Sequence, residues 1–111
     1  MARMRYEITL APEALEDLRA LKANLRAAVT DALEGFLRHE PTKTSRSRIK
    51  RLRGLSKPQY RLRVDDVRVF YDVREETVEI LAIVSKEEAE EWLEREGEYG
   101  DETSGVVGSE G

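Results

Sequence analysis

Residues 59 to 84 contain three alternating segments separated by two polar pairs, and this pattern constrains the fold more than any other feature of the sequence. The segments are 59–64, 67–74 and 77–84, and the pairs are Asp65-Asp66 and Glu75-Glu76. Alternation of apolar and polar side chains is typical of a half-buried strand, and a two-residue connection joins antiparallel neighbours. The region therefore predicts a three-stranded antiparallel meander.

The third segment is apolar on both faces, in the run Ile80-Leu81-Ala82-Ile83-Val84. Such a run is typical of a strand with neighbours on both sides, so we expect an inner strand. Ser85 follows it, and Glu88 lies three residues further on, which is the pattern of a capping box at the start of a helix. Gly97 is a suitable residue to end that helix.

The N-terminal part predicts one strand, over residues 5–10, and two helices. Pro12 suits the first turn of a helix, Asn24 is a candidate cap for a second, and Pro41 ends it. Apolar stripes at helical spacing support both helices: Leu15, Leu18 and Leu21, then Leu25, Val29, Leu33 and Phe36. We therefore expect an α+β fold of order β-α-α-β-β-β-α. Its four-stranded, mostly antiparallel sheet would carry two helices on one face and a C-terminal helix partly covering the other.

Positive charge is concentrated in one segment of an acidic chain. Residues 43–63 contain nine Lys or Arg and no Asp or Glu, although the formal net charge of the chain is -4. A dense basic segment on such a protein usually meets a polyanion. The acidic groups gather towards the C-terminus, where residues 98–111 are rich in Gly, Ser and acid. We expect a domain over residues 1–97 and a disordered acidic tail over 98–111.

Composition excludes several classes of site and location. The chain has no cysteine and one histidine, so thiolate and multi-histidine metal sites are excluded and no metal or cofactor is expected. No apolar run approaches the length of a membrane helix, and no apolar segment follows the basic first residues as in a signal peptide. A cytoplasmic protein without a membrane partner is the expectation.

Four sequence segments together resemble the RelE/ParE superfamily, the toxins of type II toxin–antitoxin modules. They are Lys50-Arg51-Leu52-Arg53-Gly54-Leu55, Tyr60-Arg61-Leu62-Arg63-Val64, Val67-Arg68-Val69-Phe70-Tyr71 and Ile83-Val84-Ser85-Lys86. The resemblance covers roughly residues 5 to 95. It implies a small antitoxin as partner and one of two activities. RelE-type members are messenger-RNA endoribonucleases that usually cut at the ribosomal A site, and ParE-type members inhibit DNA gyrase.

The resemblance also implies site residues. In the RelE pattern two cations lie one residue apart on the strand after the LRG motif, here Arg61 and Arg63, and the next strand supplies Arg68. Lys86 is the nearest match to a further basic group at the end of the last strand. The Tyr or His that often takes part in proton transfer has no counterpart, because Trp92 occupies that region.

Metal-free RNA cleavage needs charge stabilisation at phosphorus, a base for the 2′-hydroxyl and an acid for the leaving 5′-oxygen. Arginine suits the first task, because its planar fork grips phosphate oxygens and keeps its charge. It is a poor base. Lys86, Lys57, Lys50 and Glu87 therefore remain open as proton carriers, with Lys86 the best placed.

We expect a further set of residues to contact RNA: Lys50, Arg51, Arg53, Lys57 and Phe70. Phe70 shares a strand face with Arg68, where it either stacks on a base or is covered by the last helix. The plainer alternative for Arg61 and Arg63 is a pair of solvent-facing charges on an edge strand. We expect a RelE-like endoribonuclease acting on ribosome-bound mRNA. The alternative is a ParE-like gyrase inhibitor or a non-catalytic relic that keeps only the antitoxin-binding surface.

Overall fold

The computed structural model describes residues 4–99. In this part of the chain a mixed five-stranded sheet has the strand order β1-β6-β5-β4-β2. The strands are β1 (Glu7–Leu10), β2 (Ile49–Arg51), β4 (Tyr60–Val64), β5 (Val67–Arg74) and β6 (Thr77–Ser85). Only β1 and β6 run parallel, and the other neighbours are antiparallel. The predicted meander is confirmed, and β6 is an inner strand between β1 and β5 as its two apolar faces indicated.

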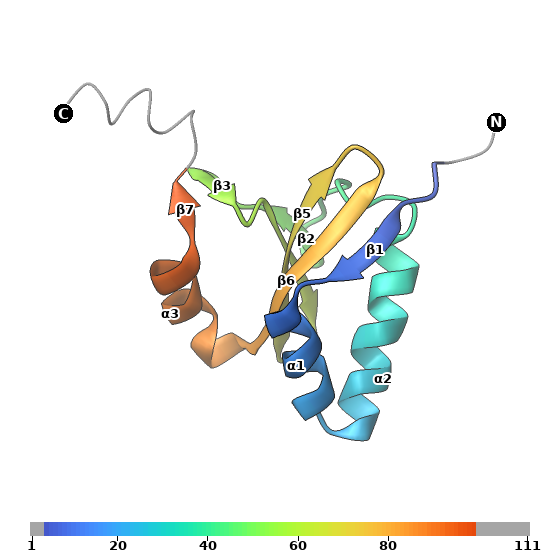
Figure 1. The fold of residues 1–111 in the computed structure, drawn as a ribbon, viewed down its shortest axis with the longest axis vertical. Coiled ribbons are helices and arrows are strands. Elements are labelled where there is room, and N and C mark those ends of the chain that lie inside the picture. The colour runs from blue at the N-terminus through green and yellow to red at the C-terminus, as the bar shows by residue number, and fades with distance from the viewer. Residues whose placement is uncertain (1–3, 100–111) are drawn as a thin grey trace.

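Two helices cover one face of the sheet (Figure 1). They are α1 (Pro12–Ala20) and α2 (Ala23–Ala32), and a π-helical turn, η1 (Leu33–Leu37), continues α2. Most of their predicted apolar stripes pack with Val69, Tyr71 and Ile80 in the main core: Leu18, Leu21, Leu25, Val29 and Leu33. Leu15 and Phe36 were also expected there but are exposed, and Leu37 of the π-helical turn is buried instead of Phe36. Pro12 occupies the first turn of α1 as expected, but α2 is preceded by Lys22 and has no side-chain cap, so the assignment of Asn24 as its cap is wrong.

The other face of the sheet carries a smaller core beneath α3 (Lys86–Glu96). Phe70 and Trp92 stack at its centre, with ring centroids 5.0 Å apart and planes inclined by 7°. The helix begins after Ser85 and ends at Gly97, as predicted, but Ser85 makes no side-chain cap hydrogen bond. Packing of Trp92, not a capping box, therefore holds α3 in place.

The sheet is larger than the four strands expected from the sequence. Residues 42–58, expected to be mostly irregular, supply β2 at the edge of the sheet and β3 (Leu55–Lys57). Glu98 and Tyr99, expected to belong to the tail, form β7 (Glu98–Tyr99) and pair with β3. The remainder of the expected tail, residues 100–111, lies outside the described residues. No helix within residues 4–99 is long and apolar enough to cross a membrane.

A β-bulge in β6 lets one strand serve both cores. Phe70 faces Ala82 and Tyr71 faces Ile80, so Leu81 is an extra residue on β6. Ile80 and Ile83 pack in the main core, whereas Leu81 and Ala82 pack beneath α3. The bulge therefore explains the continuous apolar run of the sequence.

Candidate anion-binding face

Three arginines from two adjacent strands form what we call the arginine cluster: Arg61, Arg63 and Arg68. Arg61 lies opposite Phe70, and Arg63 lies opposite Arg68, in the antiparallel register of β4 and β5. Side chains two residues apart on a strand share a face. All three therefore lie on the face of the sheet that carries α3, and β4 lies beyond the β5–β6 part that α3 contacts.

Arg61 has the most unusual environment of the three. Its Nε is buried and has no hydrogen-bond partner. Partial burial lowers the pKa of Arg61, and the neighbouring charges of Arg68 and Arg63 lower it further. A guanidinium held among like charges with an unused donor favours the approach of an anion, which would supply both a partner and a compensating charge.

The other two arginines complete the cluster in different ways. Arg68 Nη1 donates to the carbonyl oxygens of Asp65 at 3.0 Å and Val67 at 3.1 Å, so the β4–β5 turn fixes its guanidinium. Arg63 is exposed. Among residues 4–99, no carboxylate forms an ion pair with any member of the cluster. The three positive charges are thus brought together without internal neutralisation.

Two lysines have different relations to the cluster. Lys50 on β2 lies directly opposite Arg61 and is exposed, so it extends the cationic surface across a third strand. Lys86 lies at the start of α3, where its Nζ is 3.5 Å from Asp66 Oδ1 at the β4–β5 turn. The structure therefore pairs Lys86 with a carboxylate and places Lys50 beside the arginines.

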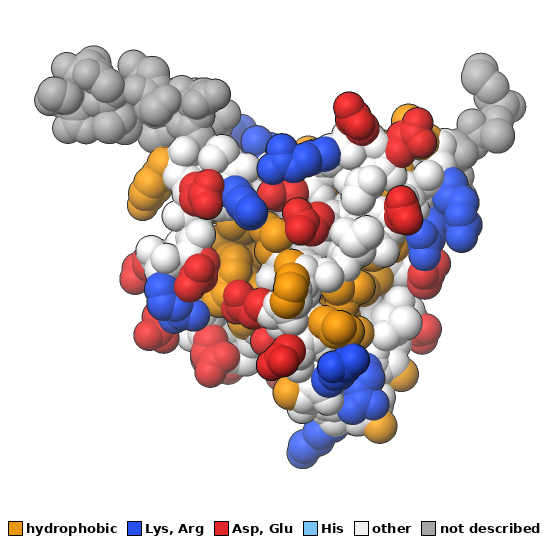
Figure 2. Space-filling model, in the orientation of Figure 1, with side chains coloured by type: hydrophobic (Ala, Val, Ile, Leu, Met, Phe, Trp, Pro, Cys, Tyr) orange, Lys and Arg blue, Asp and Glu red, His pale blue; other side chains and the backbone are white. Residues whose placement is uncertain are grey.

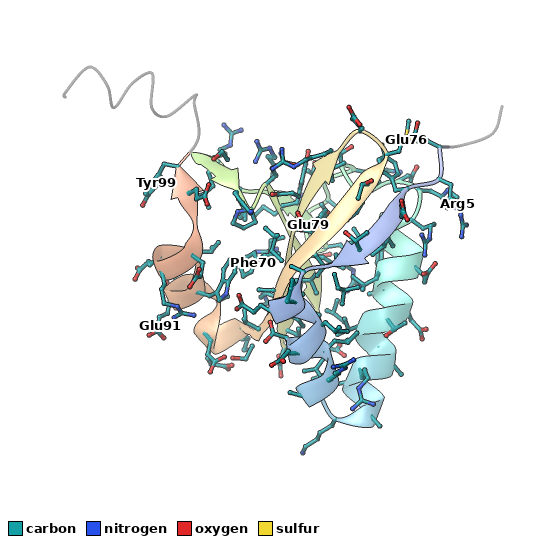
Figure 3. All side chains as sticks on the ribbon, in the orientation of Figure 1. Arg5, Phe70, Glu76, Glu79, Glu91 and Tyr99 are labelled. Carbon is teal, nitrogen blue, oxygen red and sulfur yellow. The ribbon has the colours of Figure 1, made fainter. Side chains whose placement is uncertain are left out.

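The remaining residues assigned to RNA contact from the sequence fall into separate places. Arg51 Nη1 donates to the carbonyl oxygens of Gln59 at 2.8 Å and Leu52 at 3.0 Å, and its guanidinium lies over the Tyr60 ring. Arg53 is exposed and Lys57 is half-buried. The Phe70 ring has no exposed surface, and Figure 3 shows it between the sheet and α3. Trp92 occupies the space where a base would stack on Phe70.

The comparisons with known proteins identify the family. A family model described as the ParE toxin of the type II toxin–antitoxin system, parDE, matches residues 8–90. The chain belongs to this ParE toxin family. No curated protein matches the sequence.

Solved toxin structures share the fold of this ParE-family toxin. The toxin–antitoxin complex RelBE2 from Mycobacterium tuberculosis is 26% identical over 76% of this chain and 94% of that chain, with a TM-score of 0.62. The archaeal RelE–RelB complex from Pyrococcus horikoshii is 22% identical over 75% and 97%, also with a TM-score of 0.62. A free E. coli RelE mutant is 23% identical over 78% and 90%, with a TM-score of 0.60.

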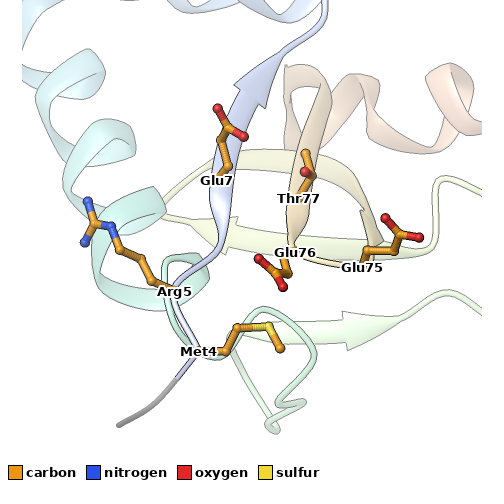
Figure 4. A pocket seen from close by; sticks show the side chains of 6 residues that line it. All are labelled: Met4, Arg5, Glu7, Glu75, Glu76 and Thr77. Carbon is orange, nitrogen blue, oxygen red and sulfur yellow. The ribbon is translucent and has the colours of Figure 1, made fainter.

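A large hollow of the toxin lies at the opposite end of β5 from the Asp65-Asp66 turn. It has a volume of about 710 Å³ and lies between the start of β1 and the β5–β6 turn (Figure 4). Its charged lining residues are Arg5, Glu7, Glu75 and Glu76. Three carboxylates and one arginine do not suit a phosphate chain, so the arginine cluster remains the candidate site.

Sequence reasoning gave no role to Asp72, which the structure places in the interior of the toxin. Its side chain is fully buried, and Oδ1 accepts a hydrogen bond from the Gln59 backbone N–H at 2.8 Å. Oδ2 has no hydrogen-bond partner, and Arg74 Nη2 is 3.8 Å from it. Asp72 therefore anchors Gln59, the residue that precedes β4 and lies two residues before Arg61. No sequence signal marked its burial, because alternation places Asp72 on the same strand face as Arg68 and Arg74.

Proposed function

We propose that this toxin is a metal-independent endoribonuclease that cleaves ribosome-bound mRNA and so inhibits translation in the cytoplasm. The observation that carries the proposal is the unpartnered Nε of Arg61 beside the positive charges of Arg63 and Arg68. A structural arginine normally has its buried donors satisfied. A site prepared for a phosphate leaves them free until the ligand arrives.

In the proposed reaction the arginine cluster binds the non-bridging oxygens of the scissile phosphate. The 2′-hydroxyl loses its proton and its oxygen bonds to phosphorus, while the bond from phosphorus to the 5′-oxygen breaks and that oxygen gains a proton. Fixed cations aimed at the developing charge supply a large part of such a rate enhancement. No redox step or additional reactant is required.

Lys50 is our proposed proton carrier, because it faces Arg61 across the β2–β4 pair. The sequence favoured Lys86, whose ammonium is instead close to Asp66. Proton transfer by a positioned side chain is typically worth about 10²–10⁴ in rate. Lys50→Ala should therefore slow cleavage more than Lys86→Ala does.

A cognate antitoxin is the proposed protein partner. The related M. tuberculosis and P. horikoshii structures are toxin–antitoxin complexes. A segment that covers the open arginine cluster needs carboxylates to compensate its charge. We therefore expect the antitoxin to place an acidic segment over Arg61 and Arg63.

Inhibition of DNA gyrase is the second candidate, and the match to the ParE family model favours it. Trp92 is consistent with this candidate as well, because its indole packs on Phe70 and is not available as a proton-transfer group. The first candidate predicts cleaved mRNA and the second predicts inhibited DNA gyrase, so one expression experiment separates them.

The experiment is induced expression followed by primer extension on a translated mRNA and a gyrase supercoiling assay. We expect ribosome-dependent cuts within codons and normal supercoiling. The variant Arg61→Ala/Arg63→Ala/Arg68→Ala should abolish the cuts and still bind antitoxin, although more weakly, because the acidic antitoxin segment loses its cationic partners. The matched control Arg5→Ala/Arg19→Ala/Arg95→Ala removes three exposed arginines elsewhere and should cut normally. Intact mRNA with inhibited gyrase would replace the first proposal by the second.

A further inference from the structure

A groove with acidic walls and an apolar floor runs between α1 and α3. We call it the α1–α3 groove and define it by Glu13, Asp17, Leu81, Ile83, Glu88 and Trp92. Its two hollows have volumes of about 310 Å³, beside Leu81, and about 360 Å³, beside Ile83. Figure 2 shows hydrophobic surface on this side of the molecule with acidic side chains next to it.

One hydrogen bond joins the walls of the groove. Trp92 Nε1 on α3 donates to Glu13 Oε2 on α1 at 3.0 Å. Glu13 and Asp17 are one helical turn apart, as are Glu88 and Trp92, so the two hollows follow each other at a spacing of about 6 Å along the helices. Each hollow is large enough to receive apolar side chains of a bound segment.

A bound polypeptide cannot pair as an extra strand with β6 at the centre of the groove floor. β1 pairs with β6 only as far as Ile80, and beyond that point the edge of β6 faces α1. Asp17 Oδ2 accepts a hydrogen bond from the Ile83 backbone N–H at 2.9 Å. Because this donor is already used, a bound polypeptide must be held by its side chains, as a helix in a groove is.

Most of the charged residues that line the groove are acidic. The hollow beside Ile83 is lined by four carboxylates, Asp17, Asp66, Glu87 and Glu88, and by no Lys or Arg of residues 4–99. The hollow beside Leu81 is lined by Glu13, Glu96 and Glu98 and by one lysine, Lys57. Of the four carboxylates beside Ile83, Asp66 alone forms an ion pair within the described residues, with Lys86. Burial raises the pKa of Asp17, and the charges of Glu13, Glu16 and Glu88 raise it further, although the bond from Ile83 opposes the shift. Like charges therefore oppose one another across the groove.

We propose that the α1–α3 groove docks a second antitoxin segment, one that combines apolar side chains with lysine or arginine. The apolar floor selects against a purely polar ligand, and the carboxylate walls repel RNA and attract cations. This inference rests on the antitoxin named in the proposed function. It assigns the basic segment to the α1–α3 groove and the acidic segment to the arginine cluster, so the two contacts differ in sign.

Trp92 gives a direct readout, because it is the single tryptophan of the chain and lines the groove. The full-length toxin is titrated with an amphipathic peptide of 11 residues, the length of α3, with leucines on one face and lysines beside them. We expect saturable binding with a shift in Trp92 emission. Two matched peptides, one with glutamate for lysine and one with serine for leucine, should bind at least about tenfold more weakly.

A variant pair assigns the binding to the groove. Glu13→Gln/Glu88→Gln removes one charge from each wall and keeps a carbonyl acceptor for Trp92, and it should weaken peptide binding about fivefold. Glu90→Gln/Glu94→Gln removes the same charge from exposed positions of α3 outside the groove and should change the affinity less than twofold. Equal effects of the two variants would overturn the proposal.

Two further measurements separate this proposal from its alternatives. If the groove held the basic segment of a second copy, sedimentation would show dimers that disappear in Glu13→Gln/Glu88→Gln, and the antitoxin assignment would be wrong. The arginine-cluster triple variant should bind the peptide like the natural chain. Peptide binding that survives a failed cleavage assay would leave the groove proposal standing without the nuclease proposal.

Discussion

Arg61 combines a stabilised position in the sheet with an unsatisfied side chain. Its backbone pairs on both sides, with Lys50 and Phe70, while its Nε has no partner. A buried donor without a partner typically costs about 1–3 kcal/mol, and partial exposure of this guanidinium reduces that figure. The unpartnered Nε lowers the free energy of unfolding of the free protein, and a bound anion would supply the missing hydrogen-bond partner.

Arg61→Met should therefore separate stability from activity. The methionine keeps the apolar stem but removes the orphaned donor and one of three like charges, so the free energy of unfolding should stay equal or rise by up to about 1 kcal/mol. Cleavage should fall by about 10²–10³. Urea denaturation and single-turnover cleavage test the two effects. A clear loss of stability would show that Arg61 has a structural role instead.

Asp72 should make stability depend on pH in the acid range. Burial raises its pKa above the ordinary value of 3.8, although the bond from Gln59 and the charges of Arg74 and Lys57 oppose this. The folded state then binds the proton more readily than the unfolded state, so this residue stabilises the fold as pH falls through the raised pKa and opposes folding as pH rises. Relative to Asp72→Asn, the natural chain should gain stability on acidification towards 3.8. Urea titrations of both proteins across that range test the sign, and a gain in the opposite direction would contradict it.

At this scale the sequence predicted which residues share a face but not which of them are covered. Alternation placed Arg61, Arg63, Arg68 and Phe70 together, and the register confirms it. Burial of Phe70 and pairing of Lys86 with Asp66 depend on the position of α3 over the sheet. Neither the Phe70–Trp92 stack nor the Lys86–Asp66 pair could be predicted from sequence periodicity, because each joins residues of different elements that meet only in the folded protein.

At the scale of elements, α3 is held mainly by one aromatic residue. The helix is rich in glutamate, and its inner surface consists of Trp92 with Ala89 and Leu93. Trp92 is 5% exposed and is therefore a core residue. The sequence did not predict β2, because this strand also depends on tertiary contacts. Its three residues, Ile49–Arg51, are too short and basic to indicate a strand, and their pairing with β4 creates it.

Trp92→Ala should release α3 from the sheet. Loss of a buried aromatic side chain typically costs about 3–5 kcal/mol, and far-ultraviolet circular dichroism in urea measures it. Trp92→Phe keeps a ring against Phe70 and loses only the bond to Glu13, so about 1 kcal/mol is expected. A Trp92→Ala cost below that of Trp92→Phe would contradict the role given to the stacked pair.

At the scale of the whole molecule, charges of opposite sign are kept on separate surfaces. The arginine cluster and Lys50 lie on the β4–β2 side, whereas carboxylates line the α1–α3 groove. The sequence showed a split along the chain, because the basic residues 43–63 precede a strongly acidic C-terminal part, but it did not predict the groove, to which α1 contributes Glu13 and Asp17. A net charge of -4 is therefore compatible with binding a polyanion at one surface.

RNA binding should weaken with salt in proportion to the arginines that meet phosphate. Three phosphate contacts on single-stranded RNA predict a slope of about -2 in a plot of log affinity against log salt concentration. Fluorescence anisotropy with a short RNA tests this. The Arg61→Ala/Arg63→Ala/Arg68→Ala variant should lose most of the slope, and an unchanged slope would move the RNA site elsewhere.

The extra residue in β6 has a consequence for how the protein tolerates insertions and deletions. Deleting Leu81 would remove the bulge and leave Ile80, Ala82 and Ile83 in strict alternation, so every later side chain of the strand would keep its side of the sheet. Ile83 would stay in the main core opposite Val69, with its amide within reach of Asp17. Loss of this one codon should thus be better tolerated than loss of the codon for Val69 on β5, which has no extra residue to absorb it and would turn the later side chains of β5 to the opposite face.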